Sequence, residues 1–239
     1  MYTLLLRLSG PLQSWGSDSK YEIRRTNPFP TKSGITGMIA ASLGRNRDDD
    51  RSDLSALRFG VRIDKQGTMF ADYQTGKAIN KKDRSKSKNT DAEKKKNPSD
   101  IAGNRYYLQD AKFLVGLECA DSSFLNMIMN ALLSPQYQLY MGRRACPVSL
   151  PLVIGISEIK LEDALQNTEW LLKPEERWKV DPVLHIFVEV TENVDYFEHD
   201  RAISFSREER LYEYRPVQEL YIDKSIKLPE HNPMKMIEV

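Results

Sequence analysis

The stretch Tyr2-Thr-Leu-Leu-Leu-Arg-Leu-Ser-Gly-Pro-Leu-Gln-Ser-Trp-Gly16 combines a strand pattern with an abrupt end. Leu4, Leu6 and Leu8 fall on one face of an extended segment, because alternate residues of a strand point to opposite sides. The Gly-Pro pair that follows the last of these leucines ends the strand. The sequence therefore predicts a β-strand over residues 2–8 and a loop after it.

The next periodic segment predicts a helix over residues 31–44. Thr31 or Ser33 is a suitable N-cap, and Gly44 is a suitable stop. Gly34 and Gly37 are poor helix formers, so they indicate that another part of the structure or a ligand approaches the backbone closely. Apolar residues recur at helical spacing along this segment: Ile35, Met38, Ile39 and Leu43.

The remaining pattern predicts a mixed α+β fold. After the first strand and helix we expect strands, a second helix and further strands. This order fits a ferredoxin-like, RRM-like arrangement with an added hairpin. The expected elements are strands at 58–64, 68–75 and 105–119, a helix at 121–133, and strands at 152–160, 183–191 and 211–217.

Composition limits the function only weakly. The 239 residues include 35 Lys and Arg against 34 Asp and Glu, so a net charge of +1 neither favours nor excludes a nucleic acid. Two cysteines make neither a disulfide framework nor, with the histidine spacing present, a metal site. We expect no metal, no cofactor and a reducing cytoplasmic environment. No apolar run is long enough for a membrane helix.

Residues 76–105 differ from the rest of the chain. They contain ten Lys or Arg against four acids, and ten minus four gives +6. With few large apolar residues, the segment cannot fold alone. Two interpretations fit: a surface insertion without structure, which composition alone favours, or a flexible basic arm that becomes ordered on a phosphate backbone.

Two segments carry groups suited to phosphate. Residues 10–37 place Arg24, Arg25 and Lys32 near a helix N-terminus, where backbone N–H groups favour an anion, and Trp15 offers a stacking face. An ordinary capped helix with the tryptophan in the core fits equally well. Further on, Gly142-Arg143-Arg144 brings two guanidinium groups beside a residue that permits close backbone approach, although a surface turn has the same composition.

The C-terminal part interleaves arginine with aromatic residues, a pattern that suits single-stranded nucleic acid. Glutamates lie among them, and for most of these residues the sequence favours a salt-bridged surface strand instead. The residues concerned are Arg201, Phe205, Arg207, Arg210, Tyr212, Tyr214 and Arg215.

An enzymatic site is hard to build from the three histidines, His185, His199 and His231. No Ser-His-Asp or Cys-His signature is visible. A metal-independent ribonuclease needs a base such as His or Tyr beside a cationic side chain. His199 with nearby arginines, or Tyr73, has the required chemistry, but nothing in the sequence singles it out.

The motifs together resemble the CasD subunits of the type I-E CRISPR effector complex called Cascade, which belong to the RAMP superfamily of RNA-binding proteins. Residues 4–16 carry the most specific part of the resemblance, and residues 76–105 carry the least. The other matching blocks are Arg25-Thr26; residues 30–34 with Gly37; Leu57, residues 59–62 and Asp64; residues 72–75; residues 142–144 with Cys146-Pro147; and Phe205, Arg207, Arg210, Tyr212 and Arg215.

This resemblance implies a RAMP domain over residues 1–150, with a basic thumb hairpin at 76–105, and a small antiparallel β region over 151–239. It implies a non-catalytic subunit for antiviral defence that grips the 5′ handle of the CRISPR RNA (crRNA). Its partners would be Cas backbone subunits, the large Cascade subunit and, through the complex, target DNA. The alternative is a metal-independent endoribonuclease that processes CRISPR repeat RNA, as in type I-C relatives.

The RNA-binding residues expected from the motifs and the resemblance are cationic, polar or aromatic. Arginine and lysine would neutralise phosphates, and the two aromatic residues would stack on bases or form pocket walls. The set consists of Gln13, Trp15, Arg24, Arg25, Lys32, Ser33, Tyr73, Lys77, Lys81, Lys82, Arg105, Arg143 and Arg144.

Overall fold

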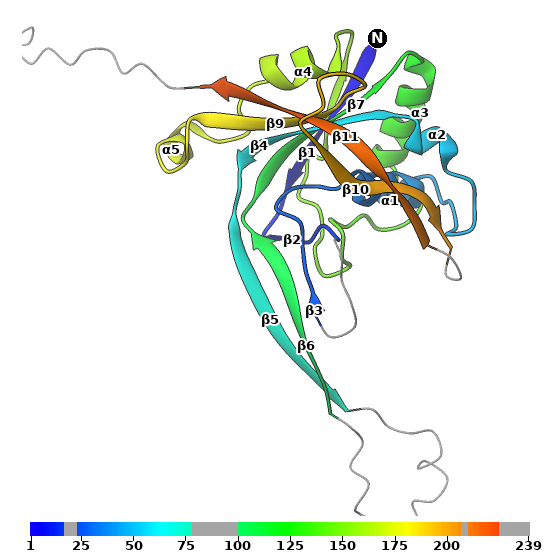
Figure 1. Cartoon of the computed structure of the whole chain (residues 1–239), viewed down its shortest axis with the longest axis vertical. Helices are drawn as coiled ribbons and strands as arrows, with labels where there is room; N and C mark the ends of the chain where they lie inside the picture. The colour runs from blue at the N-terminus through cyan, green and yellow to red at the C-terminus, as the bar shows by residue number, and fades with distance from the viewer. Residues whose placement is uncertain (17–22, 78–99, 207–209, 225–239) are drawn as a thin grey trace, which may run out of the picture.

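A seven-stranded antiparallel sheet forms the centre of the molecule (Figure 1). The computed structural model describes residues 1–16, 23–77, 100–206 and 210–224. Strand order is β10-β11-β9-β4-β7-β1-β8, and neighbouring strands within this sheet pair in antiparallel orientation. The strands are β1 (Tyr2–Ser9), β4 (Arg58–Lys65), β7 (Lys112–Cys119), β8 (Val153–Ser157), β9 (Val183–Glu189), β10 (Tyr196–Phe205) and β11 (Arg210–Asp223).

Helices cover both faces of this sheet, and the pattern of β1 explains why. Leu4, Leu6 and Leu8 pack into the core that contains α1 (Lys32–Ser42) and α3 (Ser122–Leu133). Leu5 points the other way, into a smaller core with α4 (Leu161–Asn167). The alternation predicted over residues 2–8 is confirmed. The described residues also form two single-turn helices, α2 (Ser52–Ser55) and α5 (Pro174–Arg177).

A second sheet forms a long arm that leaves the body of the molecule (Figure 1). It consists of β5 (Thr68–Lys77) paired antiparallel with β6 (Asp100–Gln109). Near its root, β6 also pairs with two short strands, β2 (Leu12–Gln13) and β3 (Ile23–Arg24).

The single long strand predicted over residues 105–119 is wrong. The chain turns at Asp110, which has a φ of 56°, and this break separates β6 in the arm from β7 in the central sheet. Gln109, Asp110, Ala111 and Lys112 are not β-prone, but β-prone residues lie on both sides of them, so the pattern predicted one strand instead of two.

The chain after residue 150 adds more structure than its pattern predicted. The short strand expected at 211–217 is the 14-residue β11, and β10 and α4 were not predicted. Polar residues interrupt the β10 pattern because one side of it is exposed to solvent. Strand β9 pairs directly with β4, so the central sheet continues across the boundary expected at residue 150.

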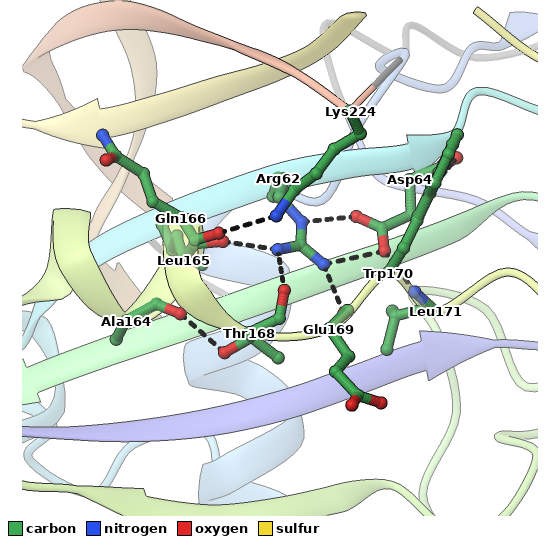
Figure 2. Close-up of polar contacts among 10 residues, drawn as sticks. All are labelled: Arg62, Asp64, Ala164, Leu165, Gln166, Thr168, Glu169, Trp170, Leu171 and Lys224. Atoms are coloured by element: carbon green, nitrogen blue, oxygen red, sulfur yellow. Dashed lines mark hydrogen bonds and ion pairs between the residues drawn. The ribbon is translucent and has the colours of Figure 1, made fainter. Parts of the chain in front are cut away.

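A buried arginine fastens α4 to the sheet (Figure 2). The guanidinium of Arg62 donates two hydrogen bonds to the carboxylate of Asp64, at 2.6 and 2.9 Å, and both side chains are fully buried. It also donates to the carbonyl oxygens of Leu165, Thr168 and Glu169, which lie at and beyond the C-terminal end of α4. One cation thus satisfies carbonyls that the helix itself leaves unpaired.

Candidate nucleic-acid interface

A groove of about 800 Å³ lies where distant segments of the chain meet. Its walls come from the loop after β3, from α1, from residues 45–51, from residues 137–143, and from β10 and β11. We call it the arginine groove. Six arginines line it, and Glu198 is the one Asp or Glu among the described residues of the lining. The arginines are Arg24, Arg25, Arg45, Arg47, Arg51 and Arg143.

Arg143 holds one wall of the groove in place. Its Nη2 donates to the carbonyl oxygens of Arg24 and Arg25, at 2.8 and 3.4 Å. Its guanidinium carbon lies 4.9 Å from the centre of the Tyr107 ring. Its Nη1 is buried and has no hydrogen-bond partner in the part of the chain that the structure describes. The side chains of Arg24 and Arg25 are exposed, so this contact presents two further cations to the groove.

Gly142 allows the loop of Arg143 to pack against the start of the chain. Its φ is +83°, and a Cβ built on it would lie 1.6 Å from the carbonyl oxygen of Ser14. The Ser14 N–H donates to the carbonyl of Met141 at 3.1 Å. The expectation that this glycine lets the backbone approach a phosphate needs correction, because the space is filled by the protein itself.

Residues 45–51 were not predicted to belong to the site. The Arg45 guanidinium donates two hydrogen bonds to the Asp53 carboxylate, at 2.6 and 2.5 Å. Arg51 is 8% exposed and lies 4.6 Å from the centre of the Phe205 ring, and burial lowers its pKa. Arg47 is exposed. Three consecutive aspartates, Asp48 to Asp50, separate Arg47 from Arg51 in the sequence and offset the positive charge of this segment, so a count of charges gave no signal.

Trp15 and Gln13 belong to the core, which corrects their expected contact with RNA. Both side chains are 0% exposed. The indole Nε1 donates to the Gln13 Oε1 at 3.2 Å, and Gln13 Nε2 donates to the Ala111 carbonyl at 2.8 Å. Gly34 gives room for this ring, since a Cβ there would lie 2.9 Å from it. The close approach expected at Gly34 is therefore to Trp15, whereas Gly37 has open space beside it.

Lys32 is also withdrawn from the surface. Its ammonium group, on a side chain 3% exposed, contacts the Glu189 carboxylate at 2.8 Å, and burial lowers its pKa. Its backbone N–H donates to Asp200 at 2.7 Å, and Asp200 also receives two hydrogen bonds from Arg215. The anion expected at the N-terminus of α1 is thus a carboxylate of the protein.

The other expected residues are spread over three places. Ser33 lines the arginine groove, and Arg144 is exposed outside its lining. Tyr73 and Arg105 are exposed on the arm, where Arg105 stands opposite Arg24 in the pairing of β3 with β6. Positions outside the described residues are Lys81, Lys82, Arg207, His231 and the side chains of Lys77 and Arg210.

His199 is the histidine that the structure places at the groove. Its Nε2 lies 3.2 Å from the Tyr212 carbonyl oxygen, and its ring centre lies 4.7 Å from that of Tyr214. His185 instead contacts Glu219 at 2.8 Å. Within the described ranges, no group of three or more His, Cys, Asp or Glu is arranged to hold a metal ion. In the same ranges no helix is long and apolar enough to cross a membrane.

Comparison with known proteins gives consistent matches. Residues 3–218 match the family described as CRISPR-associated protein (Cas_Cas5). The chain is 36% identical over 181 residues to the "CRISPR system Cascade subunit CasD" of Escherichia coli (strain K12), covering 70% of this chain and 76% of that protein.

Two solved structures share the fold. A chain of a "CRISPR RNA-guided surveillance complex" matches with a TM-score of 0.73 and 29% identity, over 92% of this chain and 89% of that one. A structure titled "Crystal structure of Cas protein" matches with a TM-score of 0.68 and 36% identity, over 93% and 95% of the two chains.

Proposed function

Since the chain belongs to the CRISPR-associated Cas5 family, we propose that it is a non-catalytic subunit of a type I-E Cascade complex that holds the 5′ handle of the crRNA in the arginine groove. The relative of known role is a Cascade subunit, and a structural match comes from an RNA-guided complex. The observation that carries the proposal is the excess of arginine in one groove, six against one acid.

The groove has the chemistry to bind a single strand of RNA. Guanidinium groups donate in pairs to phosphate oxygens, and Arg24, Arg25 and Arg47 are exposed for this purpose. Aromatic side chains stand among them, as stacking of unpaired bases requires. The cations come from three separate segments, residues 24–25, residues 45–51 and Arg143, so the site exists only in the folded chain.

The topology supports a ferredoxin-like RAMP core. Strands β1, β4, β7 and β8 alternate with α1 and α3 along the chain, and they lie in the order β4-β7-β1-β8 within the central sheet. This is the split βαβ arrangement of RRM-like domains. We assign the arm of β5 and β6 as the thumb. The lysines of residues 77–96, which include Lys81 and Lys82, would contact phosphates along the RNA backbone.

The near-neutral charge suits a subunit that binds RNA on one side and proteins on others. Lys and Arg outnumber Asp and Glu by only one over the whole chain, whereas arginine outnumbers acid by six to one among the described residues that line the groove. The remaining surface would contact Cas backbone subunits and the large Cascade subunit, and through them target DNA, in the cytoplasm.

The test is to incubate the purified full chain with labelled CRISPR repeat RNA in EDTA and to measure both binding and cleavage. Each phosphate contact should contribute about −0.7 to the slope of log affinity against log salt. Salt-sensitive binding without cleavage supports the proposal. Cleavage at one position would replace it with the endoribonuclease, for which His199 is the side chain at the groove to substitute first. Binding that ignores salt would contradict the role of the arginines.

A further inference from the structure

The one acid in the arginine groove is out of place in a site for phosphate. Glu198 lies on β10 and faces the same cavity as the six arginines. A carboxylate repels the phosphate backbone and weakens the field that the arginines create. A side chain in this position is best explained by a part of the ligand that donates hydrogen bonds.

Glu198 forms no ion pair with the residues that the structure describes. Its cross-strand partner on β11 is Arg215, but the Arg215 guanidinium donates to Asp200, at 2.9 and 3.0 Å. The remaining contact of Glu198 is with Asn27, whose Nδ2 donates to Oε1 at 3.0 Å. No hydrogen bond to Oε2 comes from the residues that the structure describes, so this atom and the second lone pair of Oε1 are available.

Asn27 links the Glu198 side chain to the core of the protein. The backbone N–H of Asn27 donates to the Trp15 carbonyl at 2.7 Å, and Trp15 is fully buried. Asn27 therefore joins Glu198 to the core and limits the directions in which its carboxylate can point. A positioned acceptor pair on a rigid wall is what discrimination between bases needs.

From this arrangement we infer that Glu198 reads the Watson–Crick edge of a guanine in the bound RNA, an inference that rests on the proposed function. Guanine presents two neighbouring donors on that edge, N1–H and N2–H, which match the two oxygens of a carboxylate. Adenine, cytosine and uracil each place an acceptor beside their donor, and a carboxylate repels that acceptor. Unpaired bases are commonly read on this edge while they stack on aromatic or arginine side chains.

Side chains suited to stack on such a base lie in the same cavity. Phe205, Tyr212 and His199 line the groove with Glu198, and Arg51 lies over the Phe205 ring. The base would lie against the wall formed by β10 and β11. Its phosphates would face the arginines of residues 24–25 and 45–51, which flank α1, together with Arg143.

The test measures binding of the full chain to oligouridine RNAs in which guanosine replaces one uridine at each position in turn. One of these should bind about tenfold more tightly than oligouridine, since a good bidentate pair to a base discriminates by at least that order. Inosine at that position lacks the N2 amino group and should lose most of the gain.

The variant Glu198→Gln separates base reading from a structural role, because its amide oxygen still accepts from Asn27. It should bind oligouridine more tightly than the native chain and show no guanosine gain. The matched control is Glu213→Gln, an equal change of charge at an exposed position of β11 outside the groove lining, which should keep the gain.

The outcomes distinguish the two proposals. Salt-sensitive binding without a guanosine gain, or a gain that survives in Glu198→Gln, overturns the role of Glu198 and leaves the proposed function standing. Failure of every RNA to bind with salt sensitivity contradicts the proposed function, and the inference falls with it.

Discussion

The Nη2 of Arg143 donates a hydrogen bond of 2.8 Å to the carbonyl oxygen of Arg24, across 119 positions of sequence. This contact joins the loop after α3 to the strand β3, and it places both side chains in one groove. Arg143 therefore supports the segment that carries two further arginines of the groove, and under the proposed function it also supplies a cation to the RNA.

Replacing Arg143 by alanine should weaken RNA binding by about tenfold or more, because the change removes a charge-assisted contact and releases the Arg24 segment. The matched control is Arg144→Ala, which removes the same charge from the next residue, exposed and outside the groove lining. That variant should lose less than about fivefold. Titration at two salt concentrations measures both. Equal losses would show that only net charge matters.

Replacing Gly142 by alanine should destabilise the fold by about 3 kcal/mol or more. The residue has a φ of +83°, and the new Cβ would meet the Ser14 carbonyl oxygen. Gly37→Ala is the control, since Gly37 lies within a helix with open space beside it. It should stabilise the chain by about 0.5 to 1 kcal/mol. Urea unfolding compares them, and a stable Gly142→Ala variant would contradict the packing described.

The sequence allowed the central fold to be predicted because its strands and helices carry clear periods. The leucines of β1 and the apolar face of α1 are examples, and both are confirmed. The break at Asp110 was missed because β-prone residues continue on both sides of it. Strand β10 was missed because it pairs with only one neighbour and exposes one face, which leaves a mixed pattern.

The site was less predictable, because side-chain type does not reveal which way a side chain points. Trp15 and Lys32 have the chemistry of an RNA contact, yet each finds its partner inside the protein, in Gln13 and Glu189. Arg51 was not predicted, because the aspartates beside it in the sequence hide any excess of positive charge, yet it lines the groove. The groove forms where segments far apart in the sequence meet, and this convergence depends on the tertiary fold, which a local sequence pattern does not reveal.

Replacing Arg62 by alanine should cost about 3 to 5 kcal/mol, because Asp64 would remain as a buried charge without its partner. The matched comparison is Arg45→Ala. This pair has the same chemistry with Asp53, but its side chains are 24% and 37% exposed, so its loss should be below about 1 kcal/mol. Denaturant midpoints measure both. Similar costs for the two pairs would contradict the anchoring role of Arg62.

Alanine variants at Trp15 and Tyr73 should have different effects, the first on the stability of the fold and the second on RNA binding. Trp15→Ala should cost about 3 to 5 kcal/mol of stability, since it empties a fully buried site. Tyr73 is 67% exposed on the arm, so Tyr73→Ala should leave stability within about 0.5 kcal/mol. If its ring stacks on a base, RNA affinity should fall by about 1 to 3 kcal/mol. Unchanged affinity in Tyr73→Ala would remove it from the interface.

RNA binding should become stronger as the pH falls, through the protonation of Glu198. Burial, with the nearby Asp200 carboxylate, raises the pKa of the Glu198 carboxyl. As pH falls through that raised pKa the groove loses its one negative charge, and because phosphate favours the neutral form, binding takes up a proton. Oligouridine affinity measured from about pH 7.5 down to about pH 4.5, near the ordinary pKa of a glutamate, should rise more in the native chain than in Glu198→Gln, which has no proton to gain at this position. Parallel pH profiles for the two proteins would assign the dependence to other groups and show that Glu198 stays distant from the RNA.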